Sequence, residues 1–301
     1  MKKRRILLAL IMLIISGISL TTATYAWFTA NQKVTVEQVD VKATASGGIQ
    51  ISADAANWSN EVSLEQLKAV GTNSIPDTAA QPVSTIGVNG TTGQFDFFLG
   101  TLDDAGSQVN LAAEAEGNGN IVAFDLYFYT ATAKTMRFDA TTAVTAKNAE
   151  NDKNLKYSMR IGFLYQGNTP TSVAATAIAL KNGTSANQKI WEPYADVHTD
   201  YATNQLSANG VMTTMGAKAA TAPDTYVAMN NDTYFKSITA TEGLVTTNNG
   251  VNYPTSVTWS LSPGISKIKV YIWIEGQDID CEDTASLGAG FSTTLGFTIA
   301  A

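Results

Sequence analysis

The stretch Phe291-Ser-Thr-Thr-Leu-Gly-Phe-Thr-Ile299, close to the end of the chain, alternates between apolar and polar side chains. In an extended conformation, one face of this stretch carries its large apolar residues, Phe291, Leu295, Phe297 and Ile299. Alternation with a period of two is typical of a strand with one buried face. We therefore predict a strand over 291–299 that packs its apolar face on a core.

Two earlier segments show the same pattern. In 267–275 the even-numbered face is aliphatic, with Ile268, Val270, Ile272 and Ile274. The odd-numbered face is amphipathic, with Lys267, Lys269, Tyr271 and Trp273. The shorter stretch Val257-Thr-Trp-Ser-Leu261 repeats the alternation, and Pro263-Gly264 between the two segments is a turn signal. We predict that these two strands form a hairpin.

Residues 121–130 are apolar on both faces, with Asp125 inside the run. Such a run predicts a central strand that is covered on both sides. The alternation predicts further strands over 95–99 and 156–165, and 173–180 is another candidate.

The first part of the chain after residue 27 is also rich in extended signals. Val34 and Val36 share one phase while Val39 and Val41 share the other, so a continuous strand would need a bulge or break near Gln38. After Gly47-Gly48, the residues Ile49 and Ile51 begin the next predicted strand.

Helical signals are few. Ser63 followed by Gln66 is a capping box that predicts a short helix over 64–70, and 280–285 is long enough for one turn. Residues 182–253 are rich in Asn, Thr, Ala and Gly and predict a loop-rich insertion with short edge strands. Together these patterns predict an all-β protein, an antiparallel β-sandwich with few short helices.

The first residues predict export. Four basic residues, Lys2 to Arg5, precede an almost unbroken apolar run, and Thr24 and Ala26 are small residues suited to a signal peptidase that cuts before Trp27. We expect 1–26 to be a signal peptide and 27–301 to be a single β-sandwich domain. The alternative is a retained leader that anchors the chain, since 6–28 is just long enough to span a bilayer. In both cases the rest of the chain lies outside the cytoplasm.

Composition restricts the chemistry. Removing the leader takes away 4 of the 19 basic residues and none of the 26 acidic ones, which leaves 15 basic against 26 acidic residues and a net charge of −11. This acidity argues against a nucleic-acid partner and against docking to anionic lipid, so we expect contact with a membrane only through the leader before cleavage. One histidine, His198, and one cysteine, Cys281, exclude most catalytic constellations, so we expect no enzyme. A lone cysteine closes no internal disulfide, and we expect Cys281 to be buried as a small apolar residue.

An acidic cluster follows the 267–275 strand. Glu275, Asp278 and Asp280 place carboxylate oxygens at short spacing, which is how calcium sites on loops are often built, although their order differs from an EF-hand. The alternative is a solvated turn with acidic residues at a helix start. Calcium is therefore the one candidate cofactor, and we expect no other.

The junction Thr24-Tyr-Ala-Trp-Phe28 resembles the leader end of the TasA and camelysin family of exported bacterial surface and biofilm-matrix proteins, whose leaders are cut by a SipW-type signal peptidase. The layout is also similar, with a Val-rich segment soon after the leader, a central aromatic strand and a C-terminal β hairpin. The resemblance implies a jelly-roll sandwich that assembles into extracellular fibres. It also implies that the mature N-terminal segment of one subunit, with Phe28, Val34 and Val36 as apolar anchors, completes the sheet of the next.

The function expected from this resemblance is that of a secreted structural protein whose partners are identical subunits or a related matrix protein. Strand donation requires an extended, alternating segment free to leave its own domain, which 27–41 provides. Two other classes stay open: a membrane-anchored or wall-associated adhesin that binds a ligand through 182–253, and an extracellular hydrolase that works through paired carboxylates. No carboxylate pair stands out by its spacing or by an apolar setting.

Overall fold

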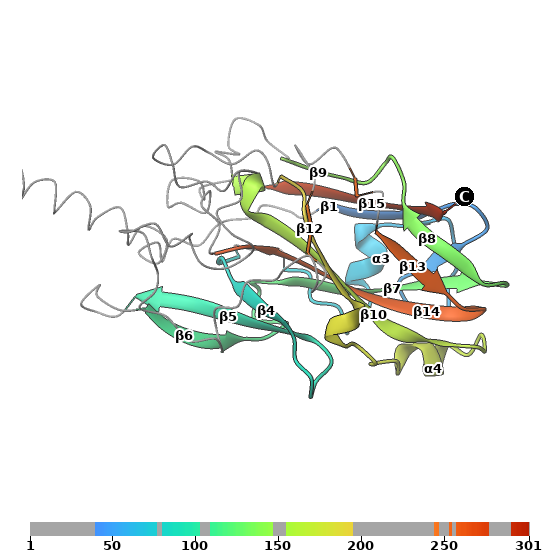
Figure 1. The fold of residues 1–301 in the computed structure, drawn as a ribbon, viewed down its shortest axis with the longest axis horizontal. Coiled ribbons are helices and arrows are strands. Elements are labelled where there is room, and N and C mark those ends of the chain that lie inside the picture. Colours follow the sequence, from blue (N-terminus) through green and yellow to red (C-terminus); the bar gives the residue numbers. More distant parts are fainter. Residues whose placement is uncertain are drawn as a thin grey trace, which may run out of the picture.

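Two large β-sheets face each other across one apolar core, and a third, smaller sheet covers the outer face of one of them (Figure 1). The structure is a computed structural model that describes residues 40–76, 80–102, 109–146, 155–194, 244–246, 253–254, 257–276 and 290–300. The all-β sandwich predicted from the alternation is confirmed. The predicted signal peptide and the donor residues Phe28, Val34 and Val36 lie outside the described residues.

The first large sheet, sheet I, has the order β13-β8-β15-β1-β3, with β9 also paired to β15. Its central strand is the predicted one, and burial alternates along it as expected, with Phe291, Leu295 and Phe297 inside. The pair β1–β15 is parallel, and the other pairs of this sheet are antiparallel. The strands are β1 (Asp40–Ala45), β3 (Glu61–Val62), β8 (Lys134–Phe138), β9 (Ala143–Ala146), β13 (Thr258–Leu261) and β15 (Phe291–Ile299).

The second large sheet, sheet II, has the order β12-β11-β10-β14-β7-β2. Its three long inner strands are antiparallel to one another, and the edge pair β11–β12 is parallel. The strands are β2 (Gln50–Ser52), β7 (Val122–Thr130), β10 (Met159–Thr169), β11 (Gln188–Glu192), β12 (Leu244–Thr246) and β14 (Gly264–Ile274). Strands β11 and β12 lie in the segment predicted to be a loop-rich insertion, and β11 contributes the buried Trp191 to the core.

The third sheet, sheet III, has the order β4-β5-β6. Its strands are β4 (Ser84–Val88), β5 (Phe95–Leu102) and β6 (Val109–Glu114). The rings of Phe95 and Phe97 on β5 pack on Tyr271 and Trp273 of β14, with centroid distances of 4.8 to 6.3 Å. The aromatic part of the amphipathic face predicted for 267–275, Tyr271 and Trp273, is thus covered by a third layer.

Short helices connect the strands. The predicted capping box is present: the Ser63 hydroxyl accepts from the Gln66 N–H, and the Gln66 side chain accepts from the Ser63 N–H. It begins α3 (Leu64–Lys68), which buries Leu67 in the core. The others are α4 (Ala174–Ile178) and the 3₁₀ turns η1 (Leu155–Ser158) and η2 (Ser185–Asn187).

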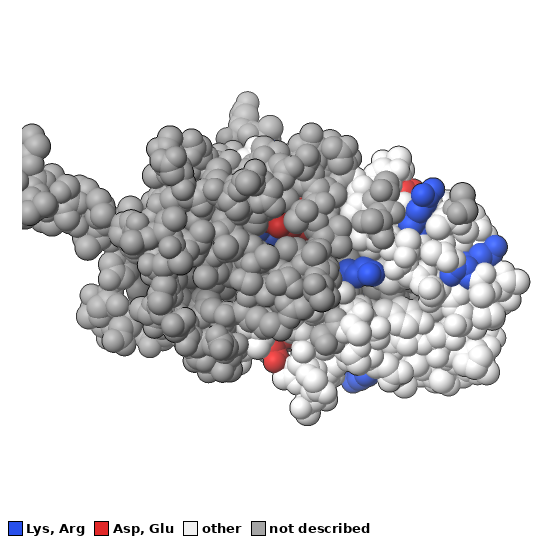
Figure 2. All heavy atoms as spheres, viewed as in Figure 1, with Lys and Arg blue, Asp and Glu red and all other residues white. Residues whose placement is uncertain are grey.

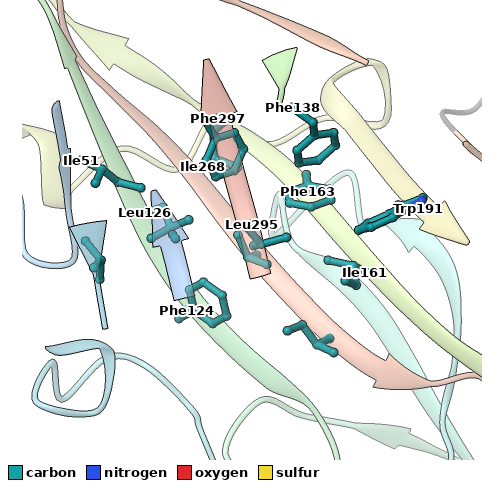
Figure 3. Packing of buried hydrophobic residues seen from close by; sticks show 14 of the residues in the cluster. Ile51, Phe124, Leu126, Phe138, Ile161, Phe163, Trp191, Ile268, Leu295 and Phe297 are labelled. Carbon is teal, nitrogen blue, oxygen red and sulfur yellow. The ribbon is translucent and has the colours of Figure 1, made fainter. Parts of the chain in front are cut away.

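The main core lies between sheets I and II and is dominated by aromatic and aliphatic side chains (Figure 3). The ring of Phe138 lies at the centre of an aromatic cluster, with centroids 5.1 to 5.8 Å from four neighbouring rings: Phe163, Trp191, Trp259 and Phe297. Because sheet I supplies Phe138, Trp259 and Phe297 while sheet II supplies Phe163 and Trp191, this cluster joins the two sheets.

Two sequence predictions of local structure are wrong. Strands β13 and β14 do not form a hairpin, because β13 pairs with β8 in sheet I while β14 pairs with β7 and β10 in sheet II. The turn at Pro263-Gly264 therefore crosses from one sheet to the other. The candidate strand over 173–180 is instead the helix α4, in which three of the five residues are alanine, the strongest helix former.

Candidate functional site

The predicted donor segment 27–41 overlaps the start of β1, so its last two residues, Asp40 and Val41, are paired within the chain's own domain. Asp40–Lys42 pair with Ser292–Thr294 of β15, and β3 pairs only with the later residues Ala43 and Thr44. Ala43 and Ala45 are buried in the main core. The chain that precedes Asp40 thus meets the domain at an inner strand of sheet I, next to its C-terminal strand.

Sheet I ends on its other side at β13, which among the described residues pairs only with β8. Trp259 and Leu261 point into the core, while Thr258 and Ser260 are exposed. Natural sheet edges are commonly protected by charged residues, proline or bulges. The four residues Thr258–Leu261 carry no charge, no proline and no bulge, so within the described part of the chain β13 forms an unprotected edge.

Glu275, the first of the three calcium candidates, points into the protein and is 1% exposed. Its carboxylate accepts hydrogen bonds from the Ser84 hydroxyl at 2.5 Å and from the Trp273 indole N–H at 3.1 Å. These bonds fix β4 of sheet III against the end of β14. Asp278 and Asp280 lie outside the described residues, and within the described part no group of three His, Cys, Asp or Glu side chains is arranged to hold a metal ion.

Asp125, the acid inside the apolar run of β7, is paired with Lys267 of β14 at 3.0 Å between Oδ2 and Nζ. The two side chains are 8% and 5% exposed. Burial, and after it the neighbouring Asp125 carboxylate, raise the pKa of Tyr127, so this phenol stays neutral. The ion pair neutralises both charges beneath α4, where the ammonium also donates to the Ile178 carbonyl at 3.3 Å.

Two other buried basic residues of sheet II, Lys269 and Arg160, also pair with acids. Lys269 contacts Glu116 at 2.5 Å, and Arg160 contacts Glu192 at 2.6 Å. Burial, followed by the Glu116 carboxylate, raises the pKa of Tyr271. The pairs Asp125–Lys267 and Arg160–Glu192 each join strands of sheet II. The sequence singles out Asp125 and Glu275 but not the partners that lie far along the chain.

One face of the described part shows no gathering of basic side chains. On the face drawn in Figure 2, the Lys and Arg side chains of the described residues are scattered singly. Among the described residues, no helix is both long and apolar enough to cross a membrane. His198 and Cys281 lie outside this part of the chain.

Comparison of the chain with protein-family models, with curated proteins and with solved structures found no match.

Proposed function

We propose that this chain is an extracellular structural protein, a subunit of a surface or biofilm-matrix fibre that is assembled by N-terminal donor-strand complementation. It is exported by the leader 1–26, cleaved between Ala26 and Trp27, and adopts a jelly-roll-like sandwich. The observation that carries this proposal is the position of β1. Because β1 is held between β15 and β3, the segment 27–39 is tethered to sheet I at one defined point.

The donated strand is the segment that precedes β1, and Phe28, Val34 and Val36 are its apolar anchors. Its affinity comes from main-chain hydrogen bonds to an open sheet edge, and its specificity comes from alternate side chains in pockets. Strand β13 supports this mode of assembly, because among the described residues it is a sheet edge, and it carries neither charge nor proline. Donor and acceptor lie at different places on the subunit, so the contact is head-to-tail and propagates into a fibre.

Strand donation requires a donor segment that is dispensable for the folding of its own subunit. Among the described residues, the main core begins at Ala43. A chain that lacks 27–36 is therefore expected to keep its sheets but to lose its means of joining a neighbour.

The test is electron microscopy and circular dichroism of two purified chains, residues 27–301 and residues 37–301. The longer chain is expected to form fibres, and the shorter one to stay monomeric with the same β-type spectrum. Val36→Asp should abolish fibres because it forces a charge into an apolar pocket, while Thr35→Asp, on the opposite face of the extended segment, should not. Fibres of unchanged morphology from residues 37–301 would refute strand donation.

A different result would favour the adhesin. If residues 27–301 stay monomeric over a wide range of concentration and pH, the fibre proposal fails. A natural protein that keeps Lys2 to Arg5 and pellets with membranes would then identify a membrane-anchored surface protein, and intact-mass measurement decides this point.

A further inference from the structure

A groove of about 510 Å³ opens at the end of the sandwich where β1 turns into β2 and where β7 ends. It is lined by the turn Ser46-Gly47-Gly48, by Gln50 and Asn60, and by the ring-bearing Tyr129. The turn and both amide side chains are exposed, and Tyr129 is half-buried. No residue of the lining carries a charge.

Tyr129 belongs to a pair of aromatic rings at this end of the sandwich. Its ring centroid lies 5.8 Å from that of Trp58, with the ring planes inclined by 54°. Gln50 is the residue directly opposite Tyr129 in the β2–β7 pairing. An aromatic ring and an amide that can both donate and accept hydrogen bonds therefore lie side by side on one groove wall.

The loop that carries Trp58 is held rigidly. The Asp54 carboxylate accepts from the backbone N–H groups of Ala56 and Asn57 at 2.9 and 2.8 Å. Against the opposing effect of burial, these bonds lower the pKa of Asp54 to about 2. After the loop, Ile51 and Ser59 exchange two backbone hydrogen bonds, which fix Trp58 beside Tyr129 before any ligand arrives.

We propose that this groove binds a neutral oligosaccharide, with a sugar ring stacked on Tyr129 and its hydroxyl groups hydrogen-bonded to Gln50 and Asn60. A pyranose has one face of C–H groups that suits an aromatic ring and a rim of hydroxyls that suits amides. Binding sites for small molecules combine apolar and aromatic walls with a few polar groups in this way. The uncharged lining selects against sugars that carry carboxylate or phosphate groups.

The site is independent of fibre assembly, because it uses neither the donor segment nor β13. If both proposals hold, each subunit would present a glycan-binding groove at the end of its sandwich.

The experiment measures binding by isothermal titration calorimetry to the natural protein, purified from whichever fraction of the culture holds it. The probes are three neutral hexasaccharides (cellohexaose, maltohexaose and chitohexaose) and an acidic one, the hexamer of galacturonic acid. We expect saturable binding of at least one neutral probe and none of the acidic probe. If no neutral probe binds, or if the acidic probe binds more tightly, the proposal is overturned.

Variants then locate the site. Tyr129→Ala should weaken binding about tenfold or more, as expected for the loss of a central aromatic contact, while Tyr129→Phe keeps the ring and should bind as before. Tyr157→Ala is the matched control. This half-buried tyrosine directly precedes β10 and so lies at the end of sheet II that is opposite to the groove. Thermal unfolding checks that each variant is folded. A folded Tyr129→Ala protein with undiminished affinity would place binding elsewhere and refute the assignment.

Discussion

The ion pair between Lys267 and Asp125 is the residue-level feature that most clearly links sequence to stability. Both side chains are more than nine-tenths buried, and they lie diagonally across the β7–β14 pairing, in which Lys267 is opposite Tyr127. When one partner of such a pair is removed, the other is left as an uncompensated charge away from water.

We therefore predict that Lys267→Met lowers the free energy of unfolding by about 3–5 kcal/mol. The double variant Lys267→Met with Asp125→Leu should regain much of this loss, because it buries no charge. Urea unfolding followed by circular dichroism measures both, and Lys189→Met on the half-exposed side of β11 is the control, expected within about 0.5 kcal/mol of wild type. Equal stability of the single and double variants would contradict this reading of the pair.

The sequence draws attention to Asp125 but cannot supply its partner. An acid inside an apolar strand must be neutralised, and this much follows from local sequence. Which lysine does so depends on the register between β7 and β14, which no short-range pattern encodes. The groove residues were missed for the same reason, because Gln50, Asn60 and Tyr129 come together only when β2 pairs with β7.

At the scale of elements, the predictions that succeeded rest on patterns contained within one segment. The alternation of β15 and the capping box of α3 are of this kind. The hairpin over β13 and β14 failed because a turn signal does not say whether the next strand stays in the same sheet. Gly264 shows what the turn requires: its φ is +107°, and an added Cβ would lie 2.1 Å from the Thr169 carbonyl oxygen.

Gly264→Ala is therefore expected to destabilise the protein by about 2 kcal/mol or more, through both the left-handed backbone and the clash with β10. Gly71→Ala is the control, since an added Cβ at Gly71 would meet nothing within 4 Å, and its effect should stay within about 0.5 kcal/mol. The urea concentration at the midpoint of unfolding measures the stability of both variants. Similar midpoints for the two variants would show that the crossing between sheets tolerates a side chain at 264.

At the scale of the whole molecule, the chain forms three layers that differ in how they are joined. Sheets I and II share one core and exchange strands along the sequence, because β7 and β8, and likewise β13 and β14, are consecutive strands in different sheets. Sheet III is built from three strands that are consecutive in the chain, and it rests on a separate cluster of buried residues. Cooperative units of unfolding often coincide with such contiguous motifs.

Alanine variants of two phenylalanines that hold different layers together test this organisation. Phe97 is 2% exposed and packs sheet III on the rings of Tyr271 and Trp273, whereas Phe297 is fully buried between sheets I and II. Truncation of either side chain to alanine should lower the stability of the layers that it packs by about 3–5 kcal/mol. Because sheet III is contiguous, Phe97→Ala should raise amide hydrogen exchange in β4, β5 and β6 while β15 stays protected. Phe297→Ala should raise exchange in all three sheets, since the shared core supports every layer. If both variants raise exchange equally in every strand, sheet III is no separate unit, and the sandwich unfolds as one body.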